Sequence, residues 1–133
     1  MDDDPVFPTV AWFQALARLL NSDAAFRQLS RWTSARVGFS VDGHPTIVTT
    51  LIDGSVVAVE ESEGIRGVDY RIEGPPEGWE LLFTERGSLA RATNQRYGKL
   101  RVRGNLVLAA GDNWTLANIC RRFREVNGQG DQA

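Results

Sequence analysis

The alternation of apolar and polar residues changes its period several times along this chain of 133 residues, and each change marks an expected element. Near the N-terminus, apolar residues recur every three or four positions from Val10 to Leu20, which predicts an amphipathic helix. The polar segment Asn21-Ser22-Asp23 then ends this helix and caps a second one that extends to about Trp32. The chain is therefore expected to begin with two helices.

From Arg36 the period becomes two, which is typical of β-strands with one buried face. The Asp-Gly pairs at 42–43 and 53–54 are strong signals for hairpin turns. Together these features predict strands over 36–41, 46–52, 55–59 and 67–73, the first three forming an antiparallel meander. The acidic residues Glu60, Glu61 and Glu63 are expected in an exposed loop before the fourth strand.

After Gly74-Pro75-Pro76 the alternation stops, so short helices over 79–83 and 88–94 are expected as a crossover. The segment Lys99 to Arg103 alternates three cations with two apolar residues and predicts a fifth strand with a solvated outer face. Two apolar helical segments follow, separated by Gly111-Asp112-Asn113, where Asp112 or Asn113 can cap the second. This order predicts an α+β fold, with a five-stranded, mostly antiparallel sheet covered on one face by helices.

The composition is that of an ordinary folded protein. A hydrophobic content of 42% over this length supports one domain with a core that needs no disulfide or metal. A net charge of −2 argues against a nucleic-acid-binding protein that neutralises phosphates. No apolar run approaches the roughly 20 residues that span a bilayer, and the acidic start lacks the pattern of a secretory signal. The single cysteine also suits a reducing compartment, so a cytoplasmic location is expected.

Few residues offer catalytic or metal-binding chemistry. His44 is the only histidine and lies in an expected turn, where a side chain is most often solvated. Cys120 falls on the apolar face of the last helix, where a small buried hydrophobic residue is the favoured interpretation. One His and one Cys do not supply the ligands of a metal site. We therefore expect no catalytic residue, no metal and no cofactor.

Two other features concern possible partners. Arginines and Lys99 concentrate between 91 and 103, which indicates a solvated sheet face and, as a second interpretation, a docking surface for an acidic partner or anionic lipid. Four tryptophans and six phenylalanines are numerous for a sheet of short strands covered on one face. With apolar helices on both sides of Gly111, this excess suggests a cavity or a partner groove.

Residues 97–105, with the sequence Tyr-Gly-Lys-Leu-Arg-Val-Arg-Gly-Asn, resemble the strand-to-helix junction of the sterol carrier protein type 2 family, also called nonspecific lipid-transfer proteins. The order of expected elements agrees with that family over about residues 8 to 126. The resemblance implies a single sterol-carrier-like domain over 1–133, with polar tails at both ends and a pocket for apolar ligands between sheet and helices. It also implies that Phe83, Leu89, Leu106 and Leu108 line this pocket. The part from Asn105 to Val126 is longer than in a typical member.

The expected function is to bind and carry an apolar ligand, such as a fatty acid, an acyl-CoA or a sterol, without catalysis. The residues expected around the cavity are Trp79, Leu82, Phe83, Leu89, Leu106, Leu108, Trp114, Ile119 and Phe123. One alternative is a small α+β enzyme of the ketosteroid isomerase type, with Asp53, Asp69 or His44 as acid or base. Another is an accessory module whose C-terminal helices pack against a partner. A homodimer and transient contact with a membrane surface or an enzyme are further alternatives, whereas nucleic acid is not expected.

Overall fold

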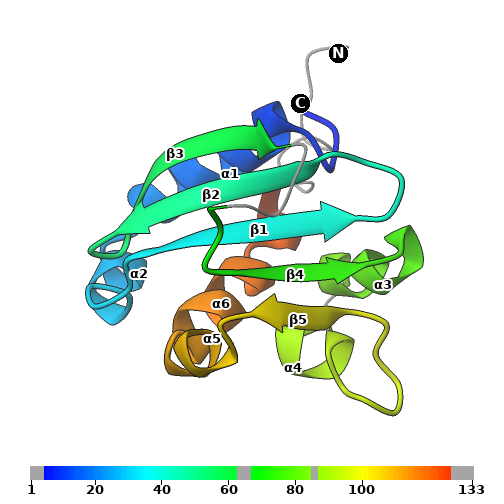
Figure 1. The fold of residues 1–133 in the computed structure, drawn as a ribbon. Helices are drawn as coiled ribbons and strands as arrows, with labels where there is room; N and C mark the ends of the chain where they lie inside the picture. The colour runs from blue at the N-terminus through cyan, green and yellow to red at the C-terminus, as the bar shows by residue number, and fades with distance from the viewer. Residues whose placement is uncertain (1–4, 63–66, 85–86, 127–133) are drawn as a thin grey trace.

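Five strands form one sheet, and the helices pack against one side of it (Figure 1). The structure is a computed structural model that describes residues 5–62, 67–84 and 87–126. In chain order the elements are α1 (Val10–Asn21), α2 (Ala24–Leu29), β1 (Ala35–Val41), β2 (Thr46–Ile52), β3 (Ser55–Ser62), β4 (Tyr70–Gly74), α3 (Pro76–Glu80), the 3-10 turn η1 (Leu81–Phe83), α4 (Leu89–Ala92), β5 (Arg101–Gly104), α5 (Leu106–Gly111) and α6 (Asn113–Arg121). This is the expected α+β architecture.

The strand order in the sheet is β3-β2-β1-β4-β5. Strands β1 and β2, β2 and β3, and β4 and β5 pair antiparallel, whereas β1 and β4 pair parallel at the centre. The sheet is therefore mixed but mostly antiparallel. The chain leaves the sheet at the β3 edge and returns to it at β4, which lies on the other side of β1 from β2. The helices that follow β4 therefore lie beneath the β4–β5 half of the sheet (Figure 1).

The polar residues that were expected to cap and turn the chain in its first half do so. The Asp23 carboxylate accepts a 3.1 Å hydrogen bond from the Phe26 N–H at the start of α2. At the β2–β3 turn, Asp53 and Gly54 both have positive φ, of 50° and 82°. A Cβ on Gly54 would come within 2.7 Å of the Ser30 carbonyl, so this turn packs closely against the end of α2 and requires glycine.

The third strand is longer than its pattern predicts. Glu60 and Glu61 lie in β3 and pair with Val48 and Ile47 of β2, so the expectation of an exposed acidic loop at these two residues is wrong. The strand continues because its ladder with β2 extends to Ser62 and because Glu60 forms a 2.7 Å ion pair with Arg36 of β1. Glu63 lies outside the described residues.

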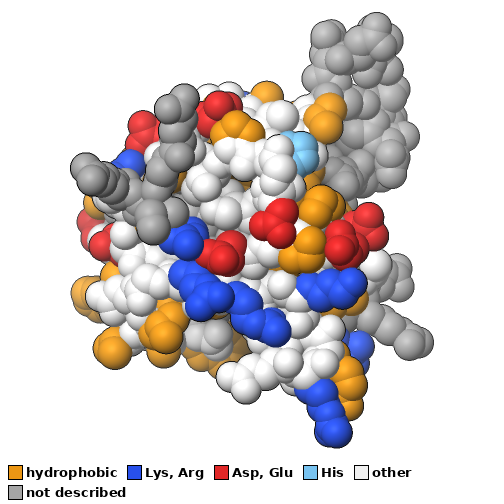
Figure 2. Space-filling view, turned by 45° about the vertical axis from the view of Figure 1, so that its right-hand side comes forward, with side chains coloured by type: hydrophobic (Ala, Val, Ile, Leu, Met, Phe, Trp, Pro, Cys, Tyr) orange, Lys and Arg blue, Asp and Glu red, His pale blue; other side chains and the backbone are white. Residues whose placement is uncertain are grey.

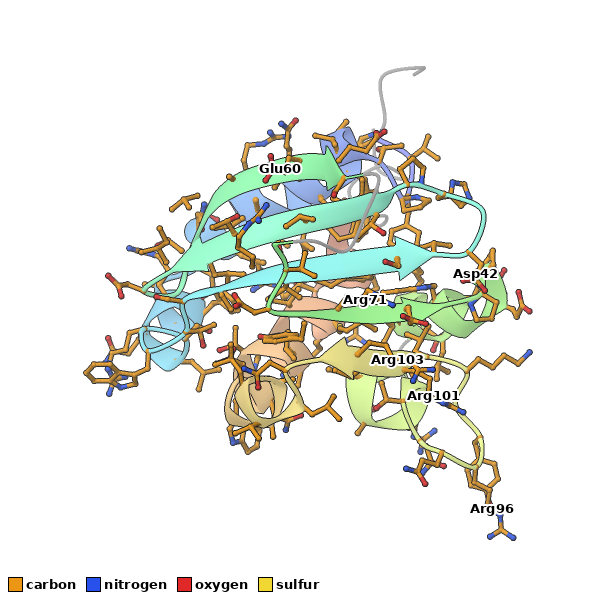
Figure 3. The ribbon with its side chains drawn as sticks, viewed as in Figure 1. Asp42, Glu60, Arg71, Arg96, Arg101 and Arg103 are labelled. Carbon is orange, nitrogen blue, oxygen red and sulfur yellow. The ribbon has the colours of Figure 1, made fainter. Side chains whose placement is uncertain are left out.

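The face of the sheet away from the helices carries charged side chains. Arg71 of β4 and Arg101 and Arg103 of β5 project from this face (Figure 3), as the alternation around Lys99 to Arg103 predicted for the fifth strand. Figure 2 shows a band of cations with carboxylates beside them, and Glu73 lies 2.7 Å from Arg71 and 3.7 Å from Arg103. Among the described helices, none is long and apolar enough to cross a membrane.

Candidate functional site

The space between the sheet and the helices is filled by aromatic rings. Phe123 is fully buried at the centre of this layer, and six ring centroids lie 4.8 to 6.2 Å from its own. The six rings belong to Phe7, Trp12, Phe13, Phe39, Trp79 and Phe83. Trp79 stacks on Phe123 with an angle of only 7° between the ring planes. The aromatic residues that are numerous in the sequence thus largely form a close-packed interior.

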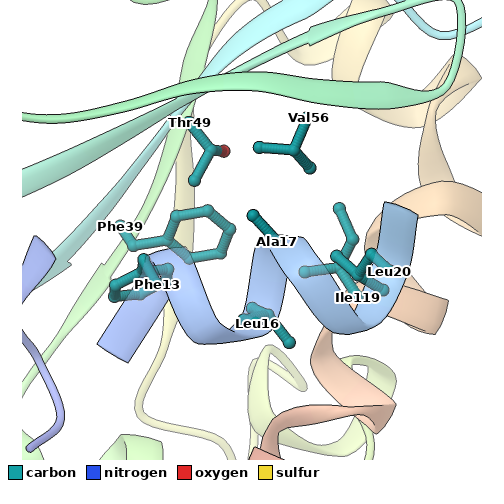
Figure 4. Close-up of a pocket in the computed structure, with 8 residues that line it drawn as sticks. All are labelled: Phe13, Leu16, Ala17, Leu20, Phe39, Thr49, Val56 and Ile119. Atoms are coloured by element: carbon teal, nitrogen blue, oxygen red, sulfur yellow. The ribbon is translucent and has the colours of Figure 1, made fainter. Parts of the chain in front are cut away.

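One interior void lies beside this cluster, between α1, the sheet and α6 (Figure 4). It is lined by Phe13, Leu16, Ala17, Leu20, Phe39, Thr49, Val56 and Ile119, and its volume is about 10 Å³. That is about the space of a single water-sized probe. The described residues therefore do not show the open cavity expected between sheet and helices, because side chains from α1, β1, α3 and α6 converge there and fill it.

The nine residues expected to line one cavity lie in three different environments. Trp79, Leu82, Leu89, Ile119 and Phe123 are buried, Phe83 and Leu108 are half-buried, and Leu106 and Trp114 are exposed. Trp114 is 71% exposed, so its expected place in an interior cavity is corrected. The reason is the orientation of α6, which turns Thr115, Leu116 and Ile119 toward the core and leaves the preceding tryptophan outside.

A larger apolar groove lies where α4, α5 and α6 meet β5. Its volume is about 230 Å³, and its walls are Leu89, Ala90, Thr93, Val102, Leu106, Ala109, Ala110, Asn113 and Leu116. The groove brings together Leu89 and Leu106, two of the four residues that the family resemblance placed at a pocket. Phe83 and Leu108, the other two, pack against the edge of the core and do not line it.

The polar groups of the groove are few. The Thr93 hydroxyl donates a 2.7 Å hydrogen bond to the Leu89 carbonyl and is thereby satisfied within α4. The Asn113 side chain is exposed and makes no hydrogen bond within the described part of the chain. The groove therefore offers an apolar surface with one amide at its rim, an arrangement suited to an apolar chain with a small polar end.

Asp112 was expected as a possible cap of α6, but its side chain contacts the sheet instead. Its carboxylate makes no capping hydrogen bond to α6 but accepts a 2.7 Å hydrogen bond from the Tyr70 hydroxyl, and both residues are buried. Burial and the adjacent Asp112 carboxylate raise the pKa of Tyr70, so the phenol stays protonated and acts as the donor. Sequence reasoning missed this contact because the two residues are 42 positions apart in the chain.

The candidate acids and bases of the enzyme hypothesis do not face an apolar interior. Asp53, Asp69 and His44 are exposed, in turns or beside the outer face of the sheet. Cys120 is fully buried as expected, and burial raises the pKa of its thiol to about 12, which makes it a poor nucleophile. No group of three or more potential metal ligands occurs among the described residues.

The fold matches solved structures over nearly the whole chain. A conserved hypothetical protein from Thermus thermophilus, described as possibly a sterol carrier protein, superposes with a TM-score of 0.76 and 23% identity over 92% of this chain and 90% of that one. The crystal structure of sterol carrier protein 2 gives a TM-score of 0.75 and 21% identity over 90% of this chain and 98% of that one. This chain has the sterol carrier protein 2 fold.

A third structure with this fold is the UbiJ-SCP2 ubiquinone synthesis protein, with a TM-score of 0.59 and 16% identity over 90% of this chain and 94% of that one. No protein-family model and no curated protein matches the sequence. At these identities the likeness establishes the sterol-carrier fold, which agrees with the resemblance of the strand-to-helix junction at residues 97–105. What the chain binds has to be argued from its own residues.

Proposed function

We propose that this protein binds and carries an apolar ligand in the groove between α4, β5, α5 and α6, without catalysing a reaction on it. The observation that carries the proposal is the groove itself, an apolar depression of about 230 Å³ walled by Leu89, Val102, Leu106 and Leu116. The sterol-carrier fold supports the same conclusion, since proteins named as sterol carriers share it. The side chains that line the groove are apolar apart from Thr93 and Asn113, a composition that suits carriage more than acid–base catalysis.

The dimensions of the groove favour a flexible chain over a rigid ring system. Its volume of about 230 Å³ lies below the roughly 300–1,000 Å³ of pockets that enclose a drug-sized ligand, so only part of a long chain would be covered. Each methylene group buried there contributes roughly 0.8 kcal/mol, and about eight of them contribute roughly 6 kcal/mol, which corresponds to a Kd of about 40 μM before the costs of association are subtracted. We therefore infer that the groove holds one end of a fatty acyl chain with an affinity of tens of micromolar or weaker, and that a sterol fits less well.

Ligand binding to delipidated protein tests this proposal. Ala110 is exposed and lines the groove, so the Ala110→Trp variant fills the groove without disturbing the core. The matched control is Ala11→Trp, at an exposed alanine of α1 that does not line the groove. With a fluorescent fatty acid as probe, we expect saturable binding to the wild type and the control and at least a tenfold loss in the Ala110→Trp variant.

Native mass spectrometry of freshly purified protein complements the titration, because a co-purifying lipid would appear as an added mass. Equal binding by both tryptophan variants would place the ligand elsewhere in the chain. No saturable binding of any fatty acid, acyl-CoA or sterol by the wild type would overturn the carrier proposal itself.

A further inference from the structure

Two tryptophans lie outside the core, one just after α2 and one at the start of α6. Trp32, just after α2, is 84% exposed, and Trp114, at the start of α6, is 71% exposed. The residues that follow them, Thr33 and Thr115, join their hydroxyl groups in a buried 2.8 Å hydrogen bond. This bond brings the two segments together, and we infer from it that the two exposed indole rings belong to one region of the surface.

Other apolar side chains extend this region. Leu29 of α2 and Leu106 and Val107 of α5 are all exposed. Figure 1 shows α2, α5 and α6 gathered beneath the same end of the sheet. We call the surface formed by Leu29, Trp32, Leu106, Val107 and Trp114 the tryptophan face. A large apolar patch exposed on a soluble protein commonly marks a surface that binds a partner or a membrane.

Cations surround the tryptophan face. Arg27 of α2 and Arg31, which follows this helix, are exposed, and the Arg31 guanidinium lies 5.3 Å from the centre of the Trp32 ring. Arg121 is exposed seven residues after Trp114 and lines the same surface pocket as that tryptophan. None of these three arginines forms an ion pair with a carboxylate in the described part of the chain.

Most carboxylates near the face already have partners. Asp23 and Glu125 both pair with Arg122, and Asp112 accepts from the Tyr70 hydroxyl. Asp53, in the turn that packs against α2, and Asp69, whose backbone carbonyl accepts from the Asn105 N–H beside α5, are exposed and are the counter-charges to consider. Against the three exposed arginines these two carboxylates leave an excess of positive charge around the apolar side chains.

We propose that the tryptophan face docks on an anionic phospholipid bilayer. Indole rings favour the headgroup region of a membrane, and exposed arginines bind the negative surface of anionic leaflets. A twofold dimer through this face would instead bring the same unpaired arginines of two copies to one interface. Leu106 belongs both to this face and to the apolar groove, so docking would bring the groove to the lipid surface.

Vesicle flotation of delipidated protein tests the docking. The vesicles are phosphatidylcholine alone or phosphatidylcholine mixed with phosphatidylglycerol. We expect the wild type to bind the anionic vesicles and the Trp32→Ser, Trp114→Ser double variant to bind at least tenfold more weakly. The Arg27→Gln, Arg31→Gln double variant should bind the anionic vesicles about 25-fold more weakly and should distinguish the two vesicles less well, since each arginine near such a surface adds about fivefold.

The chain contains a matched control. Tyr97 is 78% exposed, and the Arg96 guanidinium lies 6.0 Å from its ring centre, which repeats the pairing of Arg31 with Trp32. Figure 3 places Arg96 at the lower right of the molecule, whereas Figure 1 places α2 at the left. The Arg96→Gln, Tyr97→Ser variant should therefore bind vesicles like the wild type.

Quenching of wild-type tryptophan fluorescence by brominated phosphatidylcholine in anionic vesicles provides a readout that needs no variant. Quenching supports the proposal, because Trp12 and Trp79 are buried and only Trp32 and Trp114 can reach the lipid. No vesicle binding, equal binding by all variants, or a stable dimer in sedimentation that the tryptophan variant disrupts would each overturn it. The Ala110→Trp variant, which should lose ligand binding, should still bind vesicles. Membrane docking and ligand carriage can therefore be refuted independently of each other.

Discussion

The Tyr70 hydroxyl donates a 2.7 Å hydrogen bond to the Asp112 carboxylate and thereby ties the first residue of β4 to the turn between α5 and α6. Both side chains are withdrawn from water. The helices that carry one wall of the apolar groove are thus anchored to the sheet by a buried polar contact. A buried carboxylate is costly without its donor, so this pair is expected to control how firmly α5 and α6 are held.

Replacing Tyr70 by Phe should destabilise the protein by about 1–3 kcal/mol, because it leaves the buried Asp112 carboxylate without its donor while keeping the ring. Urea unfolding followed by circular dichroism measures the change. The Tyr97→Phe variant is the control, since that tyrosine is exposed. A Tyr70→Phe variant as stable as the wild type would show that water replaces the hydroxyl and that the pair does not anchor the helices.

Phe123 should be the most sensitive position of the interior. Its ring contacts six other aromatic rings, so the Phe123→Ala variant opens a cavity and should cost about 3–5 kcal/mol. The Phe123→Leu variant should lose less stability than Phe123→Ala, because leucine fills more of the space. Trp114→Ala, at an exposed position, should change the free energy of unfolding by less than about 0.5 kcal/mol. The reverse order of losses would contradict a core centred on Phe123.

Asn21 protects the free edge of β3. Its side-chain amide donates to the Val56 carbonyl and accepts from the Val56 N–H, both at 2.9 Å, in the manner of a neighbouring strand. The Asn21→Ala variant should cost about 1–3 kcal/mol and raise the tendency to aggregate, because it leaves two backbone groups of an edge strand unpaired. Thermal unfolding and light scattering measure the two effects. Gln14→Ala, at an exposed position of α1, should show neither.

Asp23 should make the stability depend on pH in the acid range. The hydrogen bond from the Phe26 N–H and then the contacts of Arg122 lower the pKa of its carboxyl below 3.8 in the folded protein. Since the folded pKa lies below the unfolded one, the stabilisation is present above about pH 4 and is lost as the pH falls through the folded pKa. The Asp23→Asn variant should show a smaller loss of stability on acidification.

Denaturant unfolding between about pH 2.5 and 6 measures this difference in slope. The Asp42→Asn variant, at an exposed turn, should follow the wild type. If the free energy of unfolding depended on pH in the same way in the wild type and the Asp23→Asn variant, the contacts of the Asp23 carboxylate would not stabilise the folded protein.

Local signals predicted most of the elements of the fold. The helix at Val10–Asn21, the Asp-Gly turns and the alternation around Lys99 to Arg103 each depend on neighbours in the chain, so periodicity and turn chemistry were sufficient. The length of β3 was missed because its end is decided by pairing with β2 and by the ion pair between Arg36 and Glu60. Glu60 and Arg36 are 24 positions apart, and the pairing with β2 becomes less local with each residue away from the turn.

The candidate site was predicted only in part. The resemblance placed four residues at a pocket, and two of them, Leu89 and Leu106, do line the groove. The aromatic residues were expected around a cavity, yet Trp79 and Phe123 stack face to face and help to close the space. Trp114 lies outside altogether. An apolar residue at a helical spacing shows that a helix has an apolar side, but not how two such sides fit together.

The amino-acid sequence alone thus determined the elements, their order and the apolar side of each, since these follow from side-chain chemistry over a few neighbouring positions. Only the tertiary structure decided that the interior is filled, that Asp112 turns inward to Tyr70, and that Thr33 and Thr115 meet in the interior while Trp32 and Trp114 beside them stay exposed. These outcomes depend on which side chains meet across elements that lie far apart in the chain. Packing between distant segments, which local periodicity does not encode, therefore places the groove and the tryptophan face.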